Sequence, residues 1–80
     1  MILLFRVGTA GGERQVEVDL DADLGVITYE EGQLMAAYVR RSGFAGERAW
    51  AGAHVLVQLA RQLPDVDPED LLEAAVSDAA

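Results

Sequence analysis

One long stretch of the chain, residues 46–63, is apolar around most of its circumference when it is drawn as a helix. Its polar side chains Glu47, His54, Gln58 and Arg61 follow one another at spacings of seven, four and three residues, which places them on one narrow stripe. A helix that is apolar on most sides is typical of a buried position. We therefore predict a central helix over residues 46–63, with this stripe as its solvent-facing side.

The first twenty residues contain two segments with strand character. Residues 14–20 alternate strictly, a short apolar run covers residues 2–7, and a glycine-rich loop joins the two. The pattern predicts a β-hairpin over about residues 2–20. Ile2 and Leu4 fall on the face opposite to the buried one, where they form an apolar edge.

Two further helices are indicated by their end signals. Thr28 and Glu31 form the pattern of a capping box, so we predict a helix over about residues 29–42, which Gly43 ends. Asp67 is a typical N-cap and precedes Pro68, so a last helix is expected over about residues 68–77.

The order of these elements predicts an α+β fold, in which an N-terminal β-hairpin precedes three helices packed around the second one. The 80 residues are expected to form a single domain, 1–80, with one modest hydrophobic core. The chain has no cysteine, which excludes disulfides, thiolate metal sites and a cysteine nucleophile.

The charge balance narrows the classes of partner. A formal net charge of −8 argues against binding to nucleic acid and to anionic membranes, because both require clustered Lys and Arg. The apolar run at the N-terminus is interrupted by Arg6 and is too short for a signal sequence, so we expect a soluble cytoplasmic protein.

The residues with candidate chemistry give no catalytic, cofactor or metal assignment. Asp19, Asp21, Asp23 and Glu30 have the spacing of calcium ligands in an EF-hand, but Leu24 occupies the position that needs glycine. We assign these carboxylates to a solvated strand end, and calcium binding remains the alternative. His54 is the only histidine and has no nucleophile or acid near it in sequence, so we expect a non-enzymatic protein.

The apolar residues outnumber what one hairpin and two short helices are expected to cover. This surplus predicts a partner surface, because large exposed side chains are favoured at interfaces. The candidate residues for this surface are Leu34, Tyr38, Phe44, Trp50 and Val57.

From about Val16 to Val76, the sequence resembles the small tail assembly chaperones of long-tailed bacteriophages. The resemblance rests on an Asp/Leu-rich stretch at residues 18–24, a helix start at Ile27-Thr28-Tyr29-Glu30-Glu31, and a Trp-containing helix rich in Ala, Val and Leu. It continues in the segment Leu59-Ala60-Arg61-Gln62-Leu63-Pro64-Asp65-Val66-Asp67-Pro68-Glu69-Asp70-Leu71-Leu72.

The resemblance implies a chaperone or adaptor in the host cytoplasm that binds an apolar, helical partner such as a tape-measure protein. Formation of a homo-oligomer is a further expectation, and the family also makes longer, frameshifted forms. Two alternatives come from other classes. One is a structural head or tail accessory protein of a virion, and the other is an acidic inhibitor that mimics DNA.

Overall fold

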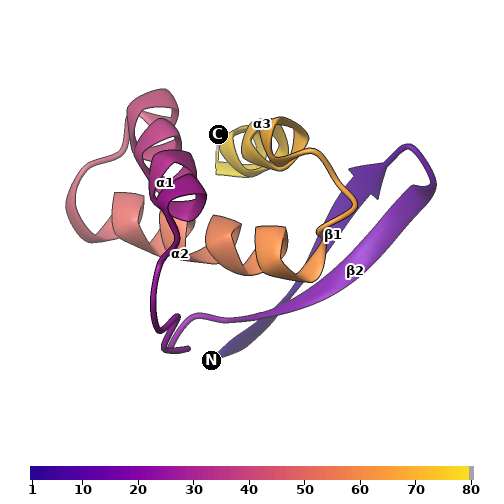
Figure 1. Ribbon diagram of the computed structural model, residues 1–80, viewed down its shortest axis with the longest axis horizontal. Helices are drawn as coiled ribbons and strands as arrows, with labels where there is room; N and C mark the ends of the chain where they lie inside the picture. Colours follow the sequence, from indigo (N-terminus) through magenta and orange to yellow (C-terminus); the bar gives the residue numbers. More distant parts are fainter. Residues whose placement is uncertain (80) are drawn as a thin grey trace.

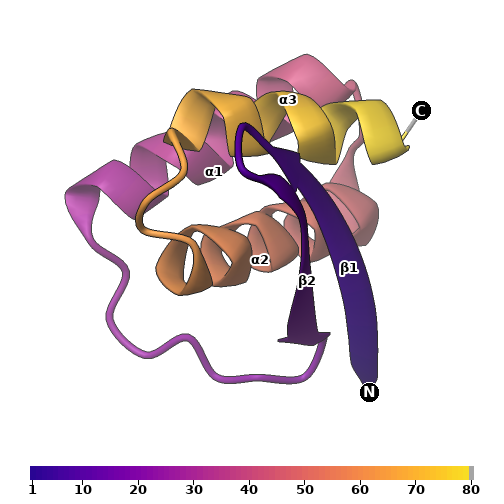
Figure 2. The same cartoon turned by 90° about the vertical axis from the view of Figure 1, so that its right-hand side faces the viewer.

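An antiparallel hairpin leads into three helices, so the α+β fold predicted from the sequence is confirmed (Figure 1). The computed structural model describes residues 1–79. The elements are β1 (Ile2–Thr9), β2 (Gly12–Asp19), α1 (Tyr29–Ser42), α2 (Gly46–Gln62) and α3 (Pro68–Ala79). Both α1 and α3 contact α2, and the hairpin packs against the helices through β2 and α2 and through β1 and α3 (Figures 1 and 2).

The hairpin follows from the alternation of its side chains. Leu3 lies opposite Val18 and Phe5 lies opposite Val16, so the apolar side chains of both strands share one face. Gly12 adopts φ 114°, which only glycine tolerates readily, and the Thr9 hydroxyl donates to the Gly12 carbonyl at 2.7 Å. The turn therefore fixes the register that places the apolar face on the helices.

Helix α1 begins and ends where its end signals predict. The Glu31 backbone N–H donates to the Thr28 hydroxyl at 3.1 Å, and the Glu31 carboxylate accepts from the Thr28 N–H at 3.0 Å. This reciprocal pair satisfies two backbone donors that the first helical turn would otherwise leave free. At the other end, Gly43 takes the left-handed conformation with φ 72°.

Helix α2 is enclosed along its middle, as its apolar circumference predicted. Its buried side chains belong to Ala49, Ala53, Val55, Leu56, Val57 and Leu59. Helix α3 begins at the predicted proline, with the Asp67 carboxylate accepting from the Glu69 N–H at 2.9 Å. Its leucines Leu71 and Leu72 are fully buried and complete the core with Val7, Val16 and Val18 from the hairpin and Tyr38 from α1.

No helix in the described part of the chain is both long and apolar enough to cross a membrane. Burial also leaves a set of large apolar side chains outside the core. Those of Met1, Ile2 and Leu4 lie at the start of the hairpin, and those of Val26 and Tyr29 lie near the start of α1. These exposed apolar side chains mark the positions where the surface of another protein molecule could pack against this chain.

Candidate functional site

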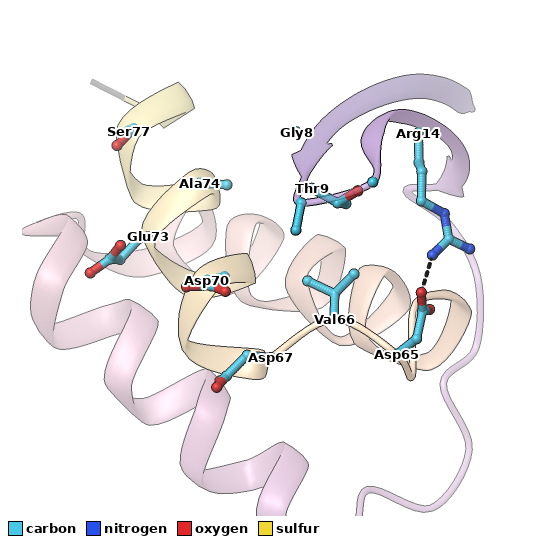
Figure 3. A pocket seen from close by; sticks show the side chains of 12 residues that line it. Gly8, Thr9, Arg14, Asp65, Val66, Asp67, Asp70, Glu73, Ala74 and Ser77 are labelled. Atoms are coloured by element: carbon cyan, nitrogen blue, oxygen red, sulfur yellow. Dashed lines mark hydrogen bonds and ion pairs between the residues drawn. The ribbon is translucent and has the colours of Figure 1, made fainter.

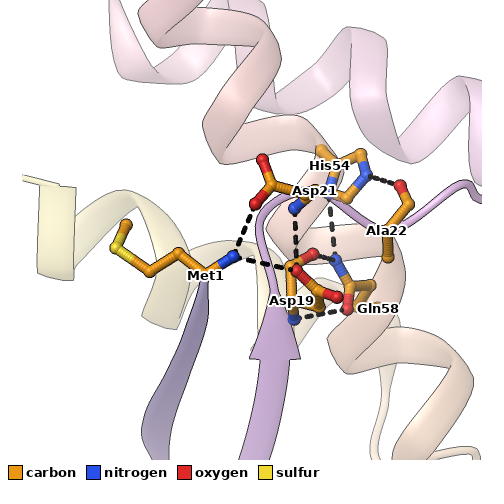
Figure 4. Close-up of polar contacts among 6 residues, drawn as sticks. All are labelled: Met1, Asp19, Asp21, Ala22, His54 and Gln58. Atoms are coloured by element: carbon orange, nitrogen blue, oxygen red, sulfur yellow. Dashed lines mark hydrogen bonds and ion pairs between the residues drawn. The ribbon is translucent and has the colours of Figure 1, made fainter.

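Three of the four residues of the polar stripe of α2, His54, Gln58 and Arg61, bind backbone groups of the chain, and only Glu47 lies free on the surface of the described chain, which corrects the expectation that the whole stripe faces solvent. The stripe binds residues 20–28, the connector between β2 and α1 (Figure 4). The Gln58 carboxamide accepts from the Asp19 N–H at 3.0 Å and donates to the Asp19 carbonyl at 2.7 Å. It therefore pairs with the outer edge of β2 as a further strand would. Gln62, one turn later, donates to the Glu17 carbonyl at 2.7 Å.

His54 takes a structural position in this network. The orientation of the Gln58 amide is set by Asp19, so the Gln58 Nε2 donates to the His54 Nδ1 at 3.0 Å. His54 is then the neutral tautomer with its proton on Nε2, which donates to the Ala22 carbonyl at 2.7 Å. Because both ring nitrogens are engaged with amide groups, the imidazole orients the connector.

Arg61 ends the stripe with an ion pair that holds the connector to α1. Its guanidinium donates to the Glu31 carboxylate at 2.7 and 3.0 Å, and to the carbonyls of Leu24 and Val26 at 2.7 and 3.1 Å. The Arg61 hydrogen bond, followed by the Thr28 N–H, lowers the pKa of Glu31 from 4.5 to about 2. One carboxylate thus caps α1 and fixes α2 to it.

The acidic side chains with EF-hand spacing do not converge on a common point. The carboxylates of Asp19 and Asp21 both bind the ammonium group of Met1 (Figure 4). The Asp23 carboxylate instead accepts from the Gly25 N–H at 2.8 Å. Glu30 lies at a separate position, on the rim of the groove described next. Within the described residues, no group of three or more His, Asp or Glu side chains has an arrangement that could hold a metal ion.

A groove lies where α1, the C-terminal half of α2 and the start of α3 meet, and its volume is about 280 Å³. Its floor is apolar and consists of Leu34, Ala37, Ala60 and Leu72. Its rim consists of the polar residues Glu30, Glu31, Gln33 and Glu69, together with Pro68. The two alanines come from facing helices, and their short side chains leave the space between the two leucines open. We take this groove as the candidate functional site.

The five residues predicted to line a partner surface do not form one surface, which corrects that prediction. Leu34 lines the groove, whereas Tyr38 is only 3% exposed and Val57 is fully buried. Phe44 is half-buried beneath the Arg48 guanidinium, 4.1 Å from its ring centroid. Trp50 is 62% exposed, although Val57, two turns later on the same side of α2, is fully buried. Tyr38 and Val57 are therefore core residues rather than contact residues.

The signal for the groove in the sequence is a pair of small residues, which the pattern of apolar positions alone did not single out. Large side chains attract attention, but the hollow is created by the small ones, Ala37 and Ala60. Their pairing depends on how α1 and α2 are placed against each other. Glu69 and Leu72 join the groove only because α3 packs on both helices.

A second hollow, the acidic cleft, lies between the hairpin loop and α3 and has a volume of about 750 Å³ (Figure 3). The carboxylates on it come from Asp65, Asp67, Asp70 and Glu73. Arg14 donates to Asp65 at 2.6 Å and lowers the pKa of that carboxyl. Because four carboxylates and Arg14 line the cleft beside its apolar residues Ala10, Val66 and Ala74, it fits an apolar helix less well than the groove does.

Comparisons of the chain with protein families, with curated proteins and with solved structures found no match.

Proposed function

We propose that this protein is a non-enzymatic assembly chaperone or adaptor that binds an apolar, helical segment of another protein in the groove. The observation that carries the proposal is an apolar floor, formed by Leu34, Ala37, Ala60 and Leu72, beneath a rim of carboxylates. An amphipathic helix fits such a surface when its apolar side chains enter the floor.

The size of the groove favours side chains of a peptide over an organic cofactor. Its volume of about 280 Å³ lies at or below the small end of ligand pockets, which span roughly 300–1,000 Å³. Within the groove, the only large apolar side chains are the two leucines, so recognition rests on shape and apolar contact. This is the character of helix-in-groove binding.

The rim determines the charge of the partner. Glu31 already pairs with Arg61 and Glu69 already pairs with Arg41, at 2.7 and 2.6 Å. Glu30 forms neither a hydrogen bond nor an ion pair with any residue that the structure describes. A Lys or Arg of the partner helix, placed next to its apolar face, is therefore expected to pair with Glu30.

The resemblance to phage tail assembly chaperones supports the same partner chemistry. A tape-measure protein is long, helical and apolar in part, and it needs to be covered before the tail is complete. In this proposal the partner is a tape-measure protein, and the basic residues next to its apolar face contact the rim.

The test is co-expression with a tape-measure protein from the same genome, followed by a pull-down and by an NMR titration with its helical segments. We expect shift changes at the groove, and we expect Ala37→Phe, which fills the floor, to weaken binding at least tenfold. Glu30→Lys is expected to weaken binding and to remove its salt dependence. Glu47→Lys is the matched control, because Glu47 is also an exposed carboxylate in the first turn of a helix.

Two results would contradict the proposal. One is a titration in which the shifts fall outside the groove. The other is equal weakening by Glu30→Lys and Glu47→Lys, because the charge of the chain would then matter and the position of the rim would not.

The acidic cleft supports a second candidate, a DNA mimic that occupies a basic surface of a DNA-binding protein. Four carboxylates from the 65–73 segment line it, in a chain with a net charge of −8. Competition with DNA for such a protein would select this function over the groove.

A further inference from the structure

The two strands of the hairpin have different outer edges. Gln58 and Gln62 bind the backbone of Asp19 and Glu17. The N–H and C=O groups of the odd-numbered residues of β2 therefore face away from β1. In an antiparallel ladder, the β1 residues directly opposite also turn their backbone N–H and C=O groups away from the partner strand, β2. The register therefore turns the N–H and C=O groups of β1 residues 2, 4, 6 and 8 outward.

The outer edge of β1 is open. No described residue hydrogen-bonds the outward backbone groups of Ile2, Leu4, Arg6 or Gly8. Natural edge strands are commonly protected by proline, by bulges or by several charges. Strand β1 has no proline, its register is unbroken from Ile2 to Thr9, and Arg6 is its only charged side chain.

Apolar side chains accompany this open edge on both faces. Ile2 is 65% exposed and Leu4 is 56% exposed on the outer face, and Leu3 is 38% exposed on the inner face. Figure 2 shows β1 on the side of the hairpin away from the C-terminal end of α2, with β2 between them. The edge thus combines free backbone groups with apolar surface that stays in water.

We propose that β1 pairs antiparallel with β1 of a second copy of the chain, with Leu4 opposite the partner's Leu4, to form a four-stranded sheet. The pairing is self-complementary about a two-fold axis. It joins outward groups to outward groups in about six hydrogen bonds, two for each directly opposed pair. On the inner face, Leu3 meets the partner's Phe5.

Several registers pair the outward backbone groups of the two β1 strands, and the contacts between side chains distinguish them. An axis at Arg6 places two guanidinium groups side by side, and an axis at Leu3 places Arg6 beside the partner's N-terminal ammonium group. An axis at Phe5 separates the two Leu4 side chains. The axis at Leu4 avoids all three, and it places Arg6 two strands, or about 10 Å, from the partner's Asp19 on the same face.

The C-terminal end of the β2 edge is covered by side chains of α2, which limits growth of the sheet beyond the dimer. Once β1 has paired with its partner, the only sheet edges left in the described part of the chain are the two β2 edges, and Gln58 and Gln62 already bind the backbone of Asp19 and Glu17 there. Head-to-tail pairing of β1 with β2 of another copy, which would extend into a fibre, is disfavoured at Glu17 and Asp19, because it would displace Gln58 and Gln62 from their backbone groups. In Figure 2, β1 lies on the opposite side from the helix ends that line the groove, so a dimer leaves both grooves free.

The first experiment measures mass by size exclusion with light scattering across a concentration series. We expect twice the chain mass of 8.6 kDa at high concentration. Leu4→Lys places two ammonium groups on the axis and is expected to give a monomer. Trp50→Lys is the control, because it adds the same charge at another exposed apolar position and is expected to remain a dimer. A wild-type monomer at every concentration, or a dimeric Leu4→Lys, overturns the proposal.

The second experiment reads the register without depending on a destabilising change, and it uses the absence of cysteine from the chain. In Leu4→Cys the two Cα atoms of the pair are about 5.5 Å apart, which suits a disulfide. In Arg6→Cys they are four residues out of register, or about 14 Å apart. We expect rapid oxidative cross-linking of Leu4→Cys and at least tenfold slower cross-linking of Arg6→Cys. Equal rates, or faster cross-linking at Arg6, overturn this register.

Discussion

Substitution of Gln58 by Met tests whether the polar stripe of α2 holds the connector and β2 in place. The wild-type carboxamide makes three hydrogen bonds, two with the backbone of Asp19 and one with the His54 imidazole. Methionine keeps the length of the side chain and its packing, and it is a good helix former. The change therefore removes the hydrogen bonds with little change in volume.

The three bonds define the expected magnitude. Each hydrogen bond contributes about 1 kcal/mol net to stability, so we expect Gln58→Met to lower the free energy of unfolding by about 2–3 kcal/mol. A chain of this size has a total stability of about 4–12 kcal/mol. A loss of this size corresponds to a decrease of about 10–20 °C in Tm.

The assay is urea unfolding followed by circular dichroism at one fixed protein concentration, since self-association would shift the midpoint. Gln62→Met is the matched control, because Gln62 lies one turn later on α2 and makes a single hydrogen bond, to the Glu17 carbonyl. We expect it to cost about 1 kcal/mol or less. Hydrogen exchange at Asp19 should quicken in Gln58→Met and stay slow in Gln62→Met, since only the first change frees the Asp19 N–H.

The reasoning is refuted if the two variants lose equal stability, or if Gln58→Met is as stable as the wild type. Either result would mean that water replaces the Gln58 contacts without cost. The connector would then be held by Arg61, by the His54 hydrogen bond to the Ala22 carbonyl and by packing.

Two further predictions concern the helix contacts. Because Arg61 lowers the pKa of Glu31 from 4.5 to about 2, this pair stabilises the fold above pH 4.5, and its contribution is lost as the pH falls through about 2. Glu31→Gln should therefore lose stability at pH 7 and flatten the dependence on pH in acid, as measured by thermal unfolding; an unchanged acid slope would contradict this. A Cβ at Gly52 would collide with the Tyr38 ring, so Gly52→Ala should lose about 1–3 kcal/mol despite its better helix propensity. Gly32→Ala meets nothing within 4 Å and should gain up to about 1 kcal/mol, and a gain at both glycines would show that the Tyr38 contact relaxes.

The local signals of the chain predicted the ends of its elements. Each of these signals involves only residues within four positions of a helix end. They are the capping pair of Thr28 and Glu31, the left-handed Gly43, and Asp67 with Pro68 at the start of α3. The alternation in β2 likewise fixed which face of the hairpin is buried. Such interactions are encoded in neighbouring residues, so their outcome depends little on the rest of the fold.

The candidate site was less accessible from the sequence. Of the five residues expected to line a partner surface, Leu34 lies in the groove, while Tyr38 and Val57 lie in the core. Hydrophobic periodicity identifies which side of a helix is apolar, but it does not say which neighbour covers that side or where the cover ends. Trp50 and Val57 lie seven residues apart on the same side of α2, yet Trp50 is exposed and Val57 is buried by neighbouring elements.

The sequence by itself determined the fold class, the central apolar helix and the helix ends, because these follow from side-chain period and from contacts between near neighbours. Only the tertiary structure decided the role of the polar stripe. A histidine and a glutamine at helical spacing read as a solvated face, yet they bind the backbone of residues that lie 32 and 39 positions away. The amino-acid sequence does not show which backbone groups of a strand or connector lack a hydrogen-bond partner. Packing of the helices against the hairpin brings the polar stripe to these groups.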